Sequence, residues 1–219
     1  MEIVIDRRFR GPSTSGNGGY TCGLIAAAVG GDVEVTLRLP PPLDVPLRVD
    51  EEGSVWDGDS LVAETAPAEV RLAVPAPVSF DDAVAAQAPD LDSPFAECFV
   101  CGHARGDDGL HIHAGPVAGR DVVAAPWVPR ADTVGPEHLW AALDCPGAYA
   151  VIAQGRGTVV LGRLAARIER LPEPGERCVA IGWALESEGR KHGAGTAVLT
   201  AEGELLGVGR ATWIAPKTA

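Results

Sequence analysis

Lysine is nearly absent from this sequence, which argues against one large class of proteins. Only Lys191 and Lys217 occur, so arginine carries almost all of the positive charge. Lys and Arg together number 18 against 30 Asp and Glu, which leaves a net charge of −12. Proteins that bind DNA or RNA hold its phosphates through clustered basic side chains, so this balance argues against nucleic-acid partners.

Long apolar runs and a disulfide framework are missing as well. No stretch approaches the roughly 18 consecutive apolar residues of a membrane-spanning helix. The first ten residues lack the basic-then-apolar order of a signal peptide, so a cytoplasmic location is expected. Five cysteines are an odd number in a chain of 219 residues, and free thiols are expected. The glycine fingerprint of dinucleotide-binding folds and the Walker phosphate loop do not occur either.

The residues that are present indicate a folded protein whose two halves share one plan. Hydrophobic residues make up 46% of the chain, and its length fits one large domain or two small ones. In each half an apolar, Ala-rich helix precedes several runs of alternating polar and apolar residues, which predict antiparallel strands. A sheet curled around one buried helix satisfies this pattern in each half.

The expected elements are bounded by proline and glycine. One helix is predicted at 20–29, between a Gly/Ser-rich turn and two glycines, and another at 136–144, which begins with a tolerated proline. Strands are predicted at 3–5, 33–39, 46–49, 53–57, 60–65, 109–113, 121–125, 158–171, 177–186 and 196–214, the last interrupted by a turn at 201–204. The Ala-, Pro- and Asp-rich stretch 68–94, with a short helix after Ser79, marks the boundary between the halves.

Four short motifs, taken in their order along the chain, resemble hotdog-fold thioesterases of the phenylacetyl-CoA type. The motifs are Gly16-Asn17-Gly18-Gly19, Cys98-Phe-Val-Cys101-Gly102 with Gly109-Leu110, Leu139-Trp-Ala-Ala-Leu-Asp144 and Gly203 to Trp213. The first resembles the Gly-His-Gly-Gly turn before the family's central helix, with Asn17 in place of the histidine. The resemblance implies an α+β double hotdog with an N-terminal unit at 1–78, a linker with a short helix at 79–94 and a C-terminal unit at 95–219.

The candidate catalytic residues are Asn17, Gly18, Gly19 and Asp144. Backbone N–H groups at a helix N-terminus stabilise negative charge on a thioester carbonyl, and glycines allow its close approach. A carboxylate in an apolar helix is costly unless it is paired or used, so Asp144 is the candidate base or nucleophile. Two alternatives stay open: Asn17 could simply cap the helix, and Pro146 could turn Asp144 toward the surface.

The resemblance implies that each site takes its N–H donors from one unit and its acid from the other. Ala26 occupies the acid position in the first helix, and the second helix begins with Gly135-Pro136-Glu137. Proline lacks an N–H and glutamate repels an oxyanion, so the second helix start is a poor source of N–H donors. The site that would combine it with the first helix, which lacks the acid, is therefore degenerate. One complete site is therefore expected, from Gly18, Gly19 and Asp144.

Further residues are candidates for substrate binding. Tyr20, Thr21 and His138 lie on or near the helices and could orient substrate or water, although packing explains each of them more simply. Coenzyme A carries phosphates, and Arg190 and Lys191 begin the densest basic run of the chain. The alternative for that run is a solvated hairpin.

The cysteine and histidine motifs raise the question of a metal. Cys98, Cys101, His103, His111 and His113 are enough ligands for zinc. No second Cys-x-x-Cys occurs, however, and the resemblance accounts for the cysteines without a metal, so neither a metal nor another cofactor is expected. Cys22 and Cys145 are weak candidates for a nucleophile, since neither has a histidine partner in the sequence.

Together these features predict an acyl-CoA thioesterase, a hydrolase that acts on a CoA thioester at one site between two hotdog units. A homodimer is expected, because related double units associate further. Two alternatives remain: a non-catalytic acyl-CoA or lipid-binding hotdog protein, and an enoyl-CoA hydratase or dehydratase. The second pairs an Asp with a nearby His, and no histidine lies at a short spacing from Asp144.

Overall fold

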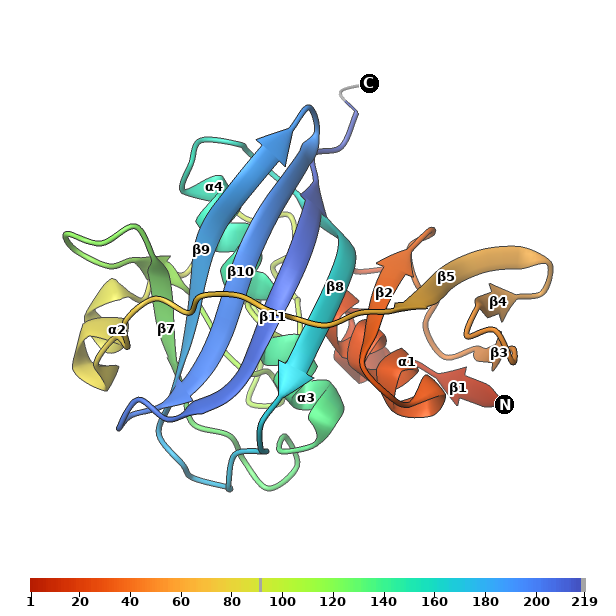
Figure 1. Ribbon diagram of the computed structural model, residues 1–219, viewed down its shortest axis with the longest axis horizontal. Helices are drawn as coiled ribbons and strands as arrows, with labels where there is room; N and C mark the ends of the chain where they lie inside the picture. Colours follow the sequence, from red (N-terminus) through yellow and green to blue (C-terminus); the bar gives the residue numbers. More distant parts are fainter. Residues whose placement is uncertain (91, 218–219) are drawn as a thin grey trace.

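The strands of the computed structural model, which describes residues 1–90 and 92–217, form one continuous antiparallel sheet (Figure 1). Its order is β1-β3-β4-β5-β2-β8-β11-β10-β9-β7-β6 in the described residues. The strands are β1 (Glu2–Val4), β2 (Val33–Leu37), β3 (Pro46–Val49), β4 (Val55–Asp57), β5 (Ser60–Pro67), β6 (Gly115–Pro116), β7 (Val123–Trp127), β8 (Val160–Ile168), β9 (Cys178–Glu188), β10 (Lys191–Thr200) and β11 (Leu205–Ile214).

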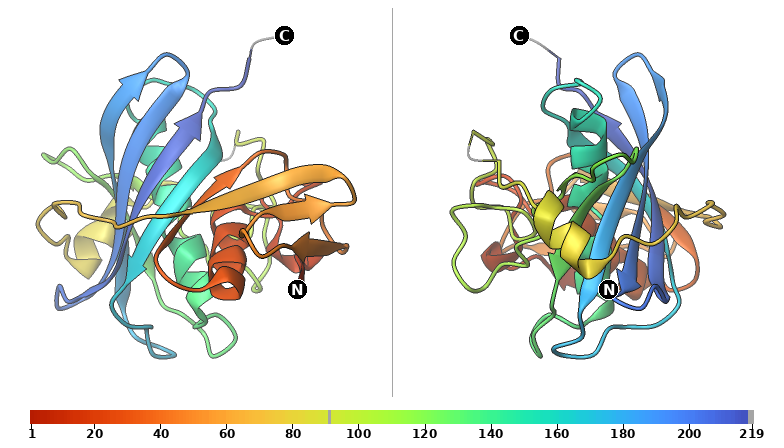
Figure 2. Two further views of the ribbon diagram at one scale, coloured as in Figure 1. Left: turned by 45° about the vertical axis from the view of Figure 1, so that its right-hand side comes forward. Right: turned by 90° about the vertical axis from the view of Figure 1, so that its left-hand side faces the viewer.

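The two halves of the chain meet in the middle of this sheet. Strand β2 pairs with β8, and at this junction Val35 lies opposite Leu164, with both side chains fully buried. The helices are η1 (Arg7–Phe9), α1 (Gly18–Val29), α2 (Phe80–Ala86), α3 (Pro136–Ala142) and α4 (Cys145–Ile152). Helices α1, α3 and α4 lie together on one face of the sheet (Figure 2). The fold is therefore the double hotdog that the sequence predicts, with continuous sheets.

Helices α1 and α3 approach closely because glycines of α1 face α3. A Cβ on Gly19 would lie 2.4 Å from the Cβ of Asp144 and 2.7 Å from the carbonyl oxygen of Trp140. A Cβ on Gly23 would lie 2.7 Å from both the Cα of Glu137 and the Cβ of Trp140. The N-terminus of α1 thus faces the C-terminal end of α3, so the two helices run antiparallel.

The segment between β5 and α2 crosses the opposite face of the sheet. Figure 1 shows this stretch passing in front of β8, β11, β10 and β9. Its Val70 and Val78 are buried in a second apolar cluster with Ile181 and Val208 of the sheet. Both faces of the C-terminal sheet are therefore covered, one by helices and the other by residues 68–79 and α2.

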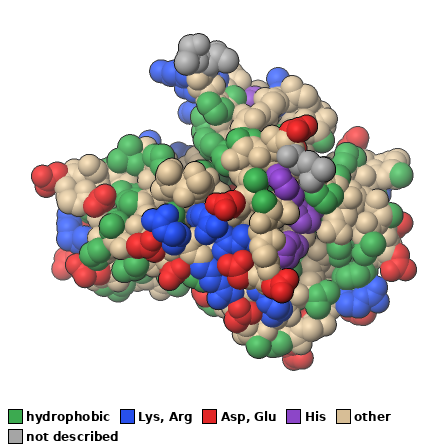
Figure 3. Space-filling view, turned by 180° about the vertical axis from the view of Figure 1, so that it is seen from behind, with side chains coloured by type: hydrophobic (Ala, Val, Ile, Leu, Met, Phe, Trp, Pro, Cys, Tyr) green, Lys and Arg blue, Asp and Glu red, His purple; other side chains and the backbone are tan. Residues whose placement is uncertain are grey.

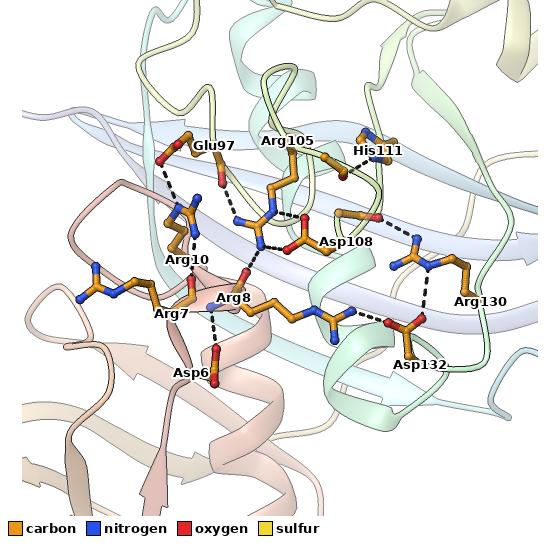
Figure 4. A network of polar contacts seen from close by, with 12 residues as sticks. Asp6, Arg7, Arg8, Arg10, Glu97, Arg105, Asp108, His111, Arg130 and Asp132 are labelled. Atoms are coloured by element: carbon orange, nitrogen blue, oxygen red, sulfur yellow. Dashed lines mark hydrogen bonds and ion pairs between the residues drawn. The ribbon is translucent and has the colours of Figure 1, made fainter.

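Polar contacts also join the two halves beside η1 (Figure 4). Arg8 forms an ion pair with Asp132 at 2.5 Å, and Arg10 forms one with Glu97 at 3.2 Å. The buried guanidinium of Arg105 is held by both carboxylate oxygens of Asp108 and donates to the backbone carbonyl oxygens of Glu97 and Arg8. This arginine therefore fixes η1 of the first half against the loop that opens the second half.

Three sequence predictions about local structure were wrong. Residues 109–113 do not form a strand, because His111 takes a left-handed conformation with φ of 54° and the segment bonds to the Cys98–Cys101 loop instead. The helix predicted at 136–144 ends at Ala142, and a separate helix begins at Cys145. Strand β10 begins at Lys191 rather than at 196, which leaves Gly189 and Arg190 as the turn after β9.

Candidate active site

Helix α1 begins at the turn that the sequence singled out. Asn17 is extended, with φ of −61° and ψ of 133°, and its side chain accepts a hydrogen bond of 2.8 Å from the backbone N–H of Tyr20. This is an N-cap, and it satisfies one of the free N–H groups of the first turn. The same amide also donates from Nδ2 to Asp144, so Asn17 both caps the helix and contacts the predicted acid.

Asp144 lies in the break between α3 and α4, buried to 3% exposure. Its Oδ2 accepts hydrogen bonds from Asn17 Nδ2 at 2.8 Å and from the backbone N–H of Gly19 at 3.0 Å. Its Oδ1 is buried without a hydrogen-bond partner among the described residues. The carboxylate is therefore anchored through one oxygen, and the other has no hydrogen-bond partner in that part of the chain.

The surroundings of this carboxylate disfavour its charge. Burial raises the pKa of Asp144 to about 7, and the nearby Cys98 adds to this shift. The hydrogen bonds from the Gly19 N–H and from Asn17 act in the opposite direction. Pro146 does not turn the side chain outward, because it sits in the first turn of α4, where the missing N–H has no intrahelical acceptor to lose. The alternative of a surface-facing Asp144 therefore does not occur.

A cavity of about 420 Å³ opens beside these groups. Asn17, Gly18 and Asp144 contribute to its wall, between the start of α1 and the start of α4. Most of the remaining wall is apolar and includes Leu37, Leu39, Phe95, Ala148, Tyr149, Ile152, Val160, Leu161, Trp213 and Ile214. An apolar chain attached to a polar reacting group therefore fits this shape.

The two glycines predicted to be catalytic, Gly18 and Gly19, have different positions. Gly18 lines the cavity, whereas the N–H of Gly19 points to Asp144 and its Cα packs against α3. The structure thus brings Asn17, Gly19 and Asp144 into direct contact across the two halves. Gly16 and Gly18 of the turn line the cavity, whereas Gly19 does not.

The other predicted substrate residues lie away from the cavity wall. Tyr20 stacks on Phe9 with ring centroids 3.8 Å apart, and His138 packs edge-on against the same pair. Burial raises the pKa of Tyr20 and lowers that of His138, as expected for groups in a core. Thr21 is fully buried. None of these three side chains belongs to the cavity wall that the described residues form.

The predicted basic run is not part of the wall either. Arg190 donates to the backbone carbonyl of Ala215, and Lys191 pairs with Ile214 at the end of the sheet. Among the described residues, the basic side chain that lines the cavity is instead Arg38, which forms an ion pair with Glu64. Sequence reasoning missed Arg38, because an arginine at the end of a strand is common and only the fold brings it to the cavity.

The N-terminus of α3 differs from that of α1, as the sequence suggests. Gly135 is the N-cap residue without a side-chain cap, and Pro136 follows it. Glu137 lies 3.1 Å from Nδ1 of His138. No aspartate or glutamate of α1 can face this end, because α1 contains neither.

Three cysteines gather beside Asp144. The sulfurs of Cys98, Cys101 and Cys145 all lie within 4.8 Å of one another. Hydrogen bonds from the thiols of Cys101 and Cys145, and from backbone N–H groups of the same loop, lower the pKa of Cys98 against the effect of its burial. Asn17 Nδ2 also approaches the Cys98 sulfur at 3.7 Å. Cys145 was not predicted to join this group, because it is 44 or more positions away along the chain.

Within the described ranges, no helix combines the length and the apolar composition that crossing a membrane would require. No family model matches this sequence. No curated protein matches it either.

Solved structures, in contrast, match over nearly the whole chain. A protein from Novosphingobium aromaticivorans, provisionally named a thioesterase, is 16% identical with a TM-score of 0.63, over 99% of this chain and 95% of its own. A protein from Thermobifida fusca, provisionally named thioesterase II, is 13% identical with a TM-score of 0.63, over 99% and 92%. A protein of unknown function from Alicyclobacillus acidocaldarius, described as having the hotdog fold, is 10% identical with a TM-score of 0.65, over 100% and 93%. By its fold, this chain is a double-hotdog protein.

Proposed function

We propose that this protein is an acyl-CoA thioesterase with one active site, at the contact between the start of α1 and Asp144. The observation that supports this most directly is the half-anchored carboxylate of Asp144, which lines the cavity: Oδ2 is bound by Asn17 and Gly19, and Oδ1 is buried without a hydrogen-bond partner in the described residues. A group fixed in this way can take a proton from water without losing its orientation. The thioesterase names of two full-length structural matches agree with this reaction but belong to those proteins.

The reaction follows from these positions. Water in the cavity gives a proton to Oδ1 of Asp144, and its oxygen forms a bond to the thioester carbonyl carbon. The carbonyl oxygen becomes negative and is stabilised by the positive end of α1, whose first residue, Gly18, lines the cavity. The carbon–sulfur bond then breaks, and the proton on Asp144 passes to the leaving thiolate, which gives a carboxylic acid and free CoA.

The cavity suits the two ends of such a substrate. Its apolar wall takes the acyl group, which loses contact with water there. Arg38 is the cation in the described part of the wall, so it is the candidate partner of a CoA phosphate. This role replaces the one that the sequence suggested for Arg190 and Lys191.

The hydrolysis of a panel of acyl-CoAs of different length tests this function. Released acids are followed by chromatography, since the protein's own thiols would react in a free-thiol assay. We expect steady turnover of at least one apolar acyl-CoA and its loss in Asp144→Asn. The matched control is Glu137→Gln, the same chemical change at the start of α3, which keeps activity.

Other outcomes separate the alternatives. Tight binding of acyl-CoA without turnover in the wild type would mean a binding protein, and hydration of an enoyl-CoA without hydrolysis would mean a hydratase. The second alternative has less support, since the hydrogen-bond partners of Asp144 are Asn17 and Gly19 rather than a histidine.

A further inference from the structure

We infer that Cys98, Cys101 and Cys145 form a binding site for a zinc ion, next to the candidate active site and separate from its chemistry. All three sulfurs lie within 4.8 Å of one another, and those of Cys98 and Cys145 are 3.9 Å apart. Zinc–sulfur bonds of about 2.3 Å in a tetrahedral site place sulfurs roughly 3.8 Å apart. The pair at 3.9 Å already has this separation, and Cys101 needs only a small adjustment.

The loop that carries two of the sulfurs is rigid. In Cys98-x-x-Cys101-Gly102, the N–H of Gly102 donates to the carbonyl oxygen of Cys98 at 2.8 Å. A Cβ on Gly102 would lie 2.5 Å from the carbonyl oxygen of Ala96 and 2.6 Å from that of Cys98, so the tight turn requires glycine. A turn of this kind holds two sulfurs on the same side before any ion binds.

The third sulfur comes from another element. Cys145 is the first residue of α4, 44 positions beyond Cys101, and it is buried with its sulfur against the loop. Asn17 Nδ2 lies 3.7 Å from the Cys98 sulfur, which adds an N–H donor of the kind that surrounds metal-bound thiolates. Three elements from both halves of the chain therefore meet at this cluster.

The remaining two cysteines provide a comparison within the same chain. Cys22 and Cys178 are buried as well, yet neither belongs to such a cluster in the described residues. Ordinary packing of small apolar side chains explains isolated cysteines. Three sulfurs that face one another cannot all be thiolates without a cation, because their charges repel, and a divalent ion offsets two of the three negative charges.

This ligand set differs from the Cys and His residues considered in the sequence, where no metal was expected. Among the described residues, no His, Asp or Glu atom joins the three sulfurs within 4.8 Å. His111 instead contacts the backbone carbonyl of Gly106 at 3.0 Å. All three cysteines line the cavity, so its water can take the fourth position of a tetrahedral zinc site.

The ion would tie the start of α4 to the loop that opens the second half. Asp144 immediately precedes Cys145, so the same link would hold the candidate base against Asn17 and Gly19. We assign the metal this positioning role only, and the hydrolysis proposed above does not pass through it.

Metal analysis of the purified full chain tests this inference. The expected result is one zinc ion per chain, retained through dialysis against buffer without metal. After exchange, Co²⁺ should give the strong visible bands of a tetrahedral site and the near-ultraviolet absorption of thiolate ligands. Cys98→Ser and Cys145→Ala should lose both signals, while Cys178→Ala should retain them.

A chelator supplies a second readout that does not depend on activity. Removal of zinc should lower the Tm of the wild type and of Cys178→Ala, but not that of Cys98→Ser. Absence of bound zinc together with a featureless Co²⁺ spectrum in the wild type would overturn the inference, as would a Cys98–Cys145 disulfide in protein purified under reducing conditions. Metal binding in Asp144→Asn, which lacks activity, would show that the site exists independently of the proposed hydrolysis.

Discussion

Gly19→Ala tests the closest contact between the two halves of the molecule. The added Cβ would lie 2.4 Å from the Cβ of Asp144, 2.7 Å from the carbonyl oxygen of Trp140 and 3.1 Å from the Cα of Ala141. Each of these atoms belongs to the backbone or is attached directly to it, so no flexible side chain can move aside. Helix α1 must therefore shift away from α3, which also lengthens the hydrogen bond from Gly19 to Asp144.

The size of the effect follows from this clash. Forcing an extra methyl group into a packed core costs about 1–3 kcal/mol. Alanine regains up to about 1 kcal/mol through its greater helix propensity, and less near a helix end. We expect a net loss of about 1–2 kcal/mol in the free energy of unfolding, which for a chain of this size lowers the Tm by roughly 2–8 °C.

Urea denaturation gives the free energy of unfolding, with thermal unfolding as a check. The control is Gly106→Ala, where an added Cβ meets no atom within 4 Å, and the expected change is close to zero. A lower midpoint with an unchanged m-value in Gly19→Ala is the expected result. Equal stability of Gly19→Ala and the wild type would refute the close packing of α1 on α3.

Three further predictions concern the surface and the assembly. Asp108→Asn removes the negative charge and one of the two acceptor oxygens that face the buried Arg105, and it should cost about 1–2 kcal/mol at pH 7. Hydrogen bonding to Arg105 lowers the pKa of Asp108 below 3.8. The stability that the Asp108 carboxylate contributes is therefore complete above pH 3.8 and is lost as the pH falls further. A stability difference between wild type and Asp108→Asn that grows on acidification would contradict this. Arg38→Ala should raise the KM for acyl-CoA several-fold and leave kcat unchanged, and equal KM values would exclude a phosphate contact. Light scattering should give about twice the chain mass of 22.6 kDa, and a single chain mass would exclude the expected homodimer.

The sequence predicted those parts of the fold that depend on local patterns. Alternation of polar and apolar residues located most strands, and the Gly-Asn-Gly-Gly turn located the start of α1, because capping chemistry is local. Pro136 likewise marked the start of α3. The pairing of Asp144 with this turn came from the family resemblance rather than from spacing.

The features that the sequence could not predict depend on contacts between distant segments. Pro146 suggested a helix end, but the same residue is compatible with the first turn of a new helix, and only packing decides between them. Cys145 meets Cys98 because the fold brings the start of α4 against the Cys98–Cys101 loop, and the spacing of these cysteines along the chain does not reveal this contact. The segment 109–113 alternates like a strand, yet it lies against the Cys98–Cys101 loop instead of the sheet.

The kcat of Asp144→Asn against the best acyl-CoA substrate tests the central claim most directly. The side-chain carbonyl of asparagine can still accept hydrogen bonds from Asn17 and Gly19, so the fold should persist, which circular dichroism and the Tm can verify. The base, however, is gone, and general-base catalysis contributes about 100- to 10,000-fold. We predict a loss of kcat in that range, whereas a folded Asp144→Asn variant with wild-type kcat would contradict the account.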